Sequence, residues 1–148
     1  MDYEAVRAGL AQAIPFNTHV GLEFVEVADG RGVVRLPDAE HLRNHVGSQH
    51  AGALFAAAEA ASGAAFVGAF AERMGEITPL ARSAEIEYSK LARGPITATA
   101  TLSEDRAALI ARLDSESRIE FPVEVVMADE DGTEVATMTV HWHVRLNR

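Results

Sequence analysis

The spacing of hydrophobic and polar positions changes several times along the chain, and each spacing predicts a different element. Apolar side chains recur at helical intervals within residues 2–13, which predicts a short amphipathic helix that ends near Pro15. Two short β-rich runs follow at residues 22–27 and 32–36. The Asp29-Gly30 pair between them favours a tight turn, so the two runs are expected to form a hairpin.

A long apolar stretch follows a polar, histidine-rich loop at residues 37–50. Residues 51–73 are rich in Ala, Phe and Gly and contain no proline, which predicts one long helix. This helix is apolar nearly all round, so it is expected to be buried nearly all round. Residues 51–71 also reach the length of a membrane span. The glutamate near their centre and the many strands elsewhere favour a buried core helix over that alternative.

Strand-like alternation dominates the second half of the chain. It appears in four stretches: residues 82–91, 96–102, 118–128 and 134–145. Between the second and third of these, residues 104–114 fit a short amphipathic helix with Ser103 as its N-cap. Arg93-Gly94-Pro95 makes a turn after the first of these stretches, and Asp-Glu-Asp-Gly-Thr joins the last two, which are expected to form a second hairpin.

The order of elements is therefore helix, two strands, long apolar helix, two strands, short helix, two strands. Six strands and one helix that is apolar on all sides are accommodated most simply when an antiparallel sheet curls around that helix. The sequence thus predicts an α+β fold. It contains no repeats, low-complexity tracts or linkers, so residues 1–148 are expected to form a single domain.

Composition narrows the possible functions. The 148 residues carry a net charge of −9 and no cysteine. A thiolate nucleophile, a disulfide framework and a cysteine-based zinc site are therefore excluded, and the acidic balance argues against a nucleic-acid partner. The N-terminal residues lack the basic and apolar regions of a signal peptide, so we expect a cytoplasmic protein with no membrane partner.

One residue of the long helix stands out. Glu59 is the only formally charged residue between Arg43 and Glu72. Burial in an apolar helix should raise its pKa, which prepares a carboxylate to act as a general base or nucleophile near neutral pH. The alternative is a structural glutamate on the one wet face of the helix.

The polar loop leads directly into the N-terminus of this helix, where free backbone N–H groups and the positive end of the helix dipole lie. Residues 44–50 read Asn-His-Val-Gly-Ser-Gln-His. Backbone amides there can hold an oxyanion, while a carboxylate about two turns further along activates water or attacks directly. Together these features suggest an acyl-transfer site.

The motif Asn44-x5-His50-Ala51-Gly52-x6-Glu59 resembles the Asn…His-Gly-Gly-x5-Ala-Asp/Glu signature of hotdog-fold thioesterases of the phenylacetate-pathway (PaaI-like) group. The resemblance covers nearly the whole chain. The second short helix and the final strand resemble a subgroup of uncharacterised (DUF4442-like) hotdog proteins most. The resemblance implies a single α+β hotdog domain, an antiparallel sheet of about six strands wrapped around one long central helix, that acts as an acyl-CoA thioesterase.

The resemblance also implies roles for single residues. Glu59 corresponds to the catalytic acid, as nucleophile or general base, and Asn44 to the side chain that positions the thioester or the water. The N–H of Ala51 corresponds to the oxyanion hole, and His50 to a loop-shaping residue. Substrate binding, including contacts to coenzyme A, is expected at Gly52, Ser89, Lys90, Arg93 and Gly94, with Arg82 as a further candidate.

Two positions depart from the family pattern: Ala51 stands where the family has Gly, and Gly63 where relatives often have Ser or Thr. These departures favour a second function, a non-catalytic hotdog module that binds acyl-CoA or fatty acid. A third is a hotdog dehydratase or hydratase that uses His45 and Glu59. The loop histidines lack zinc-type spacing, so we expect no metal, and no cofactor beyond the coenzyme A of the substrate.

A single sheet around one helix leaves its outer face and an edge strand exposed, and hotdog domains cover them by pairing. We therefore expect a homodimer or homotetramer with active sites at the subunit interface. Acyl-CoA is the expected small-molecule partner.

Overall fold

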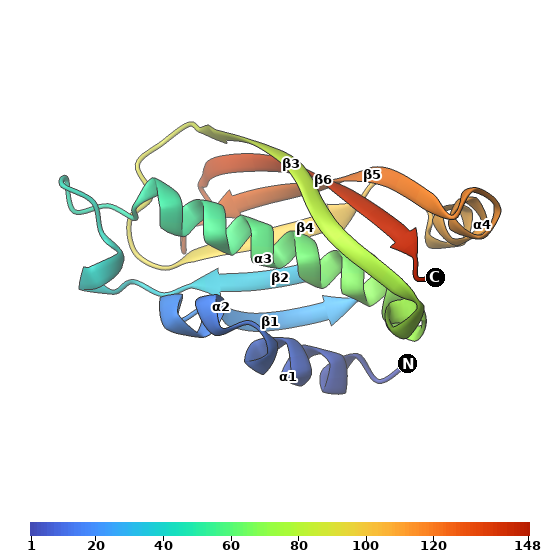
Figure 1. Ribbon diagram of the computed structural model, residues 1–148. Coiled ribbons are helices and arrows are strands. Elements are labelled where there is room, and N and C mark those ends of the chain that lie inside the picture. The colour runs from blue at the N-terminus through green and yellow to red at the C-terminus, as the bar shows by residue number, and fades with distance from the viewer.

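A computed structural model describes the whole chain, residues 1–148 (Figure 1). Its helices are α1 Tyr3–Ala13, α2 Pro15–Val20, α3 Ala51–Phe70 and α4 Arg106–Glu116. Two 3-10 helices are η1 Glu40–Leu42 and η2 Ala71–Glu76. The strands are β1 Glu23–Ala28, β2 Arg31–Leu36, β3 Ile77–Tyr88, β4 Ile96–Leu102, β5 Arg118–Ala128 and β6 Glu134–Leu146.

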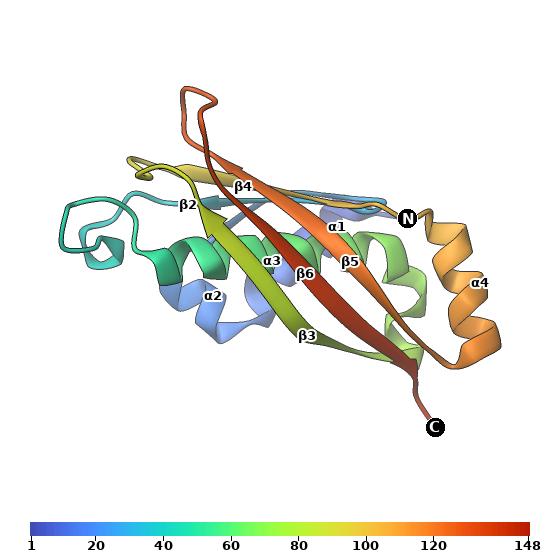
Figure 2. The same cartoon turned by 90° about the horizontal axis from the view of Figure 1, so that it is seen from above.

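All six strands form one antiparallel sheet in the order β1-β2-β4-β5-β6-β3. Helix α3 runs along one face of this sheet, α1 packs against β1, and α2 lies against α1 and α3 (Figures 1 and 2). The expected hairpins are β1–β2 and β5–β6. The six-stranded antiparallel sheet around a long central helix, predicted from the order of elements, is therefore confirmed.

Helix α3 is the centre of the hydrophobic core. Fourteen of its 20 residues are buried. The stretch Ala51–Glu76 has the length and hydropathy of a membrane span, but 78% of its apolar 18-residue window is buried inside the protein. It is therefore the core helix of the fold, as the sequence predicts.

Small residues let α3 approach the strands closely. A Cβ atom at Gly68 would lie 1.9 Å from the backbone oxygen of Ala28 in β1, and a Cβ at Gly32 would lie 2.5 Å from that of Ala61 in α3. No side chain fits at such distances, so glycine is required at both places. At Gly63 an added Cβ would be 3.7 Å from the Trp142 ring, which is an ordinary contact. An alanine would therefore fit at this position, and close packing does not require a glycine.

The first difference from the predicted elements follows Pro15. Instead of only ending α1, this proline occupies the first turn of a second helix, α2. Proline is favoured there because its fixed φ suits a helix start and its missing N–H would have no partner anyway. The chain turns out of α2 at Gly21, which adopts a left-handed φ of 83°.

Two further boundaries differ. The N-cap of α4 is Asp105 and not the predicted Ser103. The Asp105 carboxylate accepts a hydrogen bond from the Ala108 N–H at 3.2 Å. Strand β3 begins at Ile77, five residues before the predicted start, and includes Pro79. A proline is tolerated in β3 because this strand lies at the edge of the sheet, where a missing N–H breaks fewer pairings.

Candidate active site

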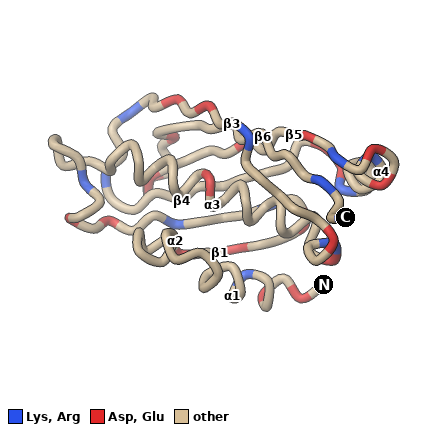
Figure 3. The backbone as a smooth tube through the Cα atoms, in the orientation of Figure 1, with Lys and Arg blue, Asp and Glu red and all other residues tan.

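Glu59 lies on the least covered stripe of α3. The stripe runs through Phe55, Glu59, Gly63 and Val67, which recur at four-residue spacing and are exposed or half-buried, while the residues between them are buried. Glu59 thus occupies the one wet face of the helix, yet it is still half-buried. Figure 3 shows acidic colour in the middle of an otherwise uncharged α3.

The environment of Glu59 changes its ionisation. Burial raises the pKa of the Glu59 carboxyl above its ordinary value of 4.5, and no neighbouring charge or hydrogen bond opposes that effect. A carboxylate without a partner in apolar surroundings is unusual unless it serves a ligand or a reaction.

An apolar cavity of about 280 Å³ opens beside Glu59. Its walls come from α1, α2, β1, α3, η2, β3 and β6, and include the side chains of Leu10, Phe24, Met74 and Trp142. Glu59 and Asn17 are the only polar side chains that line it. Cavities of this kind, mostly apolar with few polar groups, are typical of small-molecule sites.

One wall of the cavity is fixed to the turn of α3 that carries Glu59. The indole Nε1 of Trp142 donates to Ser62 Oγ at 3.2 Å, and this hydroxyl donates to the backbone oxygen of Glu59 at 2.7 Å. The Trp142 ring also stacks on Phe66, with ring centroids 5.4 Å apart. Ser62 is fully buried, so it holds the wall and does not face the cavity beside Glu59.

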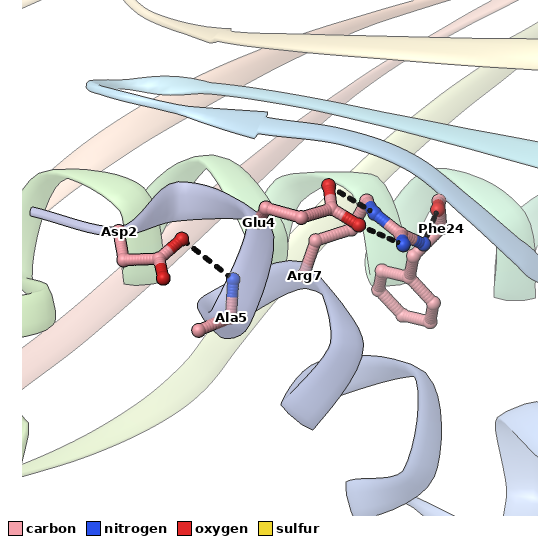
Figure 4. A network of polar contacts seen from close by, with 5 residues as sticks. All are labelled: Asp2, Glu4, Ala5, Arg7 and Phe24. Atoms are coloured by element: carbon pink, nitrogen blue, oxygen red, sulfur yellow. Dashed lines mark hydrogen bonds and ion pairs between the residues drawn. The ribbon is translucent and has the colours of Figure 1, made fainter.

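The opposite wall is held by the start of α1 (Figure 4). Asp2 caps this helix, its Oδ1 accepting from the Ala5 N–H at 3.0 Å. Arg7 pairs with Glu4 and donates from Nη1 to the backbone oxygen of Phe24 at 2.9 Å. These contacts tie α1 to β1 and keep Phe24 in place at the cavity.

The N-terminus of α3 presents one free backbone donor. His50 caps the helix, its Nδ1 accepting from the Gly52 N–H at 2.8 Å. The Ala51 N–H has no partner among the backbone or side-chain hydrogen bonds, and Ala51 is exposed. The Ala51 N–H is therefore the free backbone donor at this end of α3, whereas the Gly52 N–H is engaged by His50.

The side chain of Asn44 is committed to its own loop. Its Oδ1 accepts from the N–H groups of Val46 at 3.0 Å and Ser48 at 3.1 Å, and its Nδ2 donates to Ser48 Oγ at 2.9 Å. The structure therefore gives Asn44 a loop-closing contact and does not place it against Glu59.

The loop after β3 packs on the loop before α3. The Gln49 N–H donates to the Ala92 oxygen at 2.8 Å, and Gln49 Nε2 donates to the Gly94 oxygen at 2.9 Å. Lys90 and Arg93 are exposed in this loop and form no ion pair. The predicted coenzyme A contacts are thus brought to the same end of α3 as Ala51.

Two other residues that were predicted to contact coenzyme A do not join this group: Ser89 is engaged in a hydrogen bond, and Arg82 lies too far away. Ser89 Oγ donates to the Val135 oxygen at 3.1 Å and serves to fix the end of β3. Arg82 lies in the middle of β3, six residues before Tyr88, and is paired with Glu120. An extended strand of six residues spans about 20 Å, so Arg82 does not join Lys90 and Arg93.

Two contributors to the site were not predicted. The Tyr88 hydroxyl donates to the Ala51 oxygen at 3.2 Å and joins the end of β3 to the first turn of α3. Asn17 lines the cavity from α2, a helix that the sequence analysis did not predict. Neither residue follows a recognisable motif, and both reach the site only through the tertiary fold. The structure brings together no group of three histidines or carboxylates suited to a metal ion.

The raised pKa of Glu59 has a consequence for stability. Between pH 4.5 and that raised pKa the folded protein holds more protons than the unfolded chain, so the free energy of unfolding falls as pH rises through this window. Glu59→Gln should therefore raise the melting temperature at neutral pH, and the gain should shrink to nothing below pH 4.5. Thermal unfolding of both proteins from pH 4 to pH 8 checks this. An equal or lower melting temperature for the variant at pH 8 would contradict it.

A model of the family described as "Domain of unknown function (DUF4442)" matches residues 3–144. A search of curated proteins found no match. Among solved structures the chain is similar to a Pseudomonas aeruginosa protein of unknown function described as a probable thioesterase. The two are 28% identical over 97% of this chain and 95% of that one, with a TM-score of 0.87.

Two more distant structures share the fold. The PaaI protein from the phenylacetic acid degradation operon of E. coli is 16% identical over 97% of this chain and 93% of that one, with a TM-score of 0.76. A thioesterase family protein from Silicibacter pomeroyi is 20% identical over 97% and 98%, also with a TM-score of 0.76. The hotdog fold that the sequence resemblance implied is thereby confirmed.

Proposed function

This chain belongs to the DUF4442 family and has the hotdog fold of probable thioesterases, and from this premise we propose that it hydrolyses an acyl-CoA thioester at Glu59. The observation that carries the proposal is the half-buried, unpaired carboxylate of Glu59 at the mouth of an apolar cavity. Such a cavity suits an acyl chain, and the carboxylate suits the attack on its thioester.

The proposed reaction uses two groups of α3. The Ala51 N–H, at the positive end of the helix, donates to the thioester oxygen and stabilises the negative charge that develops on it. In one route Glu59 takes a proton from the water that attacks the carbonyl carbon. The C–S bond breaks as this proton passes to the sulfur, and coenzyme A leaves as its thiol. In the other route Glu59 attacks the carbon itself, and the C–S bond breaks to give an acyl-Glu59 anhydride and a thiolate that takes a proton from solvent; water then cleaves the anhydride and restores Glu59. Lys90 and Arg93 bind the phosphates of coenzyme A at the N-terminal end of α3.

The spacing of these two groups supports a site shared between two copies of the chain. Eight residues separate Ala51 from Glu59, a rise of about 12 Å along the helix. An oxyanion donor and a base that serve one carbonyl each work at about 3 Å from the atoms they contact. Pairing that sets Ala51 of one copy near Glu59 of the other would bring them within reach of one thioester.

Edge strand β3 offers the surface for such pairing. It is 12 residues long and exposes Leu80 and Tyr88, which are 59% and 46% accessible. The other edge strand, β1, has six residues and is covered by α1. An uncovered edge of this length is unfavourable for a monomer because it invites pairing with other chains. We expect sedimentation at micromolar concentration to give a dimer or a tetramer; a monomer would contradict the shared site.

Release of thiol from a panel of acyl-CoAs tests the proposed function. Hydrolysis gives one free thiol per thioester cleaved. The second candidate, a binding module, is favoured by the engagement of Asn44 in its own loop and predicts tight acyl-CoA binding without thiol release. A dehydratase using His45 and Glu59 predicts hydration of an enoyl-CoA without thiol release. Either of those outcomes would replace the hydrolase proposal.

A further inference from the structure

Asn17 is a buried polar residue whose side chain forms no hydrogen bond within the protein. It is 4% exposed, and its Nδ2 amide is enclosed without any hydrogen-bond partner. Buried amides are nearly always paired, because an unpaired one loses its hydrogen bonds to water and gains none in return. An exception of this kind inside a cavity points to a ligand.

The local structure around Asn17 needs only its backbone. Its N–H donates to the Ile14 oxygen at 3.1 Å, and its oxygen accepts from the N–H groups of Gly21 at 3.1 Å and Leu22 at 3.0 Å. These bonds form α2 and its exit turn, and any residue could supply them. The carboxamide itself contributes nothing to them, so its presence at this buried position requires another explanation.

The cavity gives the carboxamide a position along the acyl chain. The α3 residues that line it begin at Glu59 and continue through Gly63 to Val67, away from the helix N-terminus. With the thioester carbon at Glu59, the acyl tail runs into this part of the cavity. The volume of about 280 Å³ holds roughly nine groups the size of a water molecule, or a chain of about eight carbons.

The occupant of the cavity decides whether Asn17 finds a partner. An unsubstituted hydrocarbon tail would pack methylene groups against the carboxamide and leave it without a hydrogen bond. A tail that carries an oxygen atom would restore the bond. Apolar cavities with one or two polar groups select ligands in this way, because the wrong ligand leaves the polar group unpaired.

We infer that Asn17 is the specificity residue of the acyl cavity, and that the substrates are medium-length acyl thioesters with a hydroxyl group on the tail. The inference rests on the proposed function for the identity of the thioester. What it adds to that function is a hydrogen bond between the Asn17 carboxamide and the oxygen of the tail.

Binding measurements test this without relying on turnover. Calorimetric titrations use the Glu59→Gln protein, with octanoyl-CoA and its 3-, 5- and 7-hydroxy derivatives as probes. At least one hydroxy derivative should bind about tenfold more tightly than octanoyl-CoA, the gain expected from one added hydrogen bond. Adding Asn17→Leu, a change of similar shape, should abolish this preference and strengthen octanoyl-CoA binding. The exposed neighbour change His19→Ala should leave the preference intact.

Other results would overturn the inference. One is an equal preference for the hydroxy derivatives with and without Asn17→Leu. Another is tighter binding of octanoyl-CoA than of every hydroxy derivative, and a third is no binding of any probe. Asn17→Leu should also raise the melting temperature, because it removes an unpaired buried amide; a large fall would show a structural role instead. Absence of thiol release by the unmodified protein would contradict only the proposed hydrolase function, because the binding preference is measured independently of turnover.

Discussion

Glu59→Gln is expected to lower kcat for thioester hydrolysis by at least about 100-fold, the lower range of what a positioned base or nucleophile contributes. Glutamine keeps the shape of the side chain but cannot take a proton from water or attack a carbonyl carbon. The loss should appear in kcat with little change in KM, because the apolar cavity that holds the acyl chain is unaltered. Steady-state thiol release measures both constants.

The pH dependence of the unmodified enzyme provides an independent check. Glu59 acts in its ionised form, and burial raises its pKa above 4.5. The rate should therefore rise with pH and reach its midpoint above that value. Glu116→Gln, at the exposed end of α4 and away from the pairing edge β3, is a matched control that should leave kcat unchanged. A Glu59→Gln protein within threefold of the unmodified rate would remove Glu59 from the mechanism.

Gly68→Ala is expected to have the largest effect on stability, a loss of about 3 kcal/mol in the free energy of unfolding, the upper end of the usual cost of overpacking. The new Cβ would lie 1.9 Å from the Ala28 oxygen, so α3 and β1 would have to separate along their contact. Backbone atoms form this contact, and no side chain can rotate away to relieve it. The clash outweighs the gain of about 1 kcal/mol that alanine normally brings to a helix.

Gly63→Ala, on the same helix, is the matched control. An added Cβ there lies 3.7 Å from the Trp142 ring, which is normal packing distance. The helix preference for alanine should therefore prevail and raise stability by up to about 1 kcal/mol. Urea denaturation of the two variants gives both values. Equal stability of Gly68→Ala and Gly63→Ala would show that α3 does not approach β1 as closely as described.

Periodicity and turn residues predict most of the fold because they are local. The alternation in residues 96–102 and 118–128 gives β4 and β5 with the observed bounds, and the Asp29-Gly30 pair gives the first hairpin. Pro15 was misleading, since a proline that ends one helix can equally begin the next.

The candidate site is less predictable because it depends on where side chains point. Glu59 is identifiable as an isolated charge in an apolar helix. Nothing in the sequence, however, indicates that the Asn44 carboxamide closes its own loop or that Asn17 enters the cavity beside Glu59. Both depend on how separate segments pack, and a motif specifies the spacing of residues without their orientation.

A single-turnover experiment tests the central claim most directly. The protein in excess over octanoyl-CoA should release one thiol per substrate molecule, and the Glu59→Gln protein, shown to bind the same substrate, should release almost none in the same time. Full binding of octanoyl-CoA and its hydroxy derivatives by the unmodified protein with no thiol release would contradict the claim, as would equal release by both proteins.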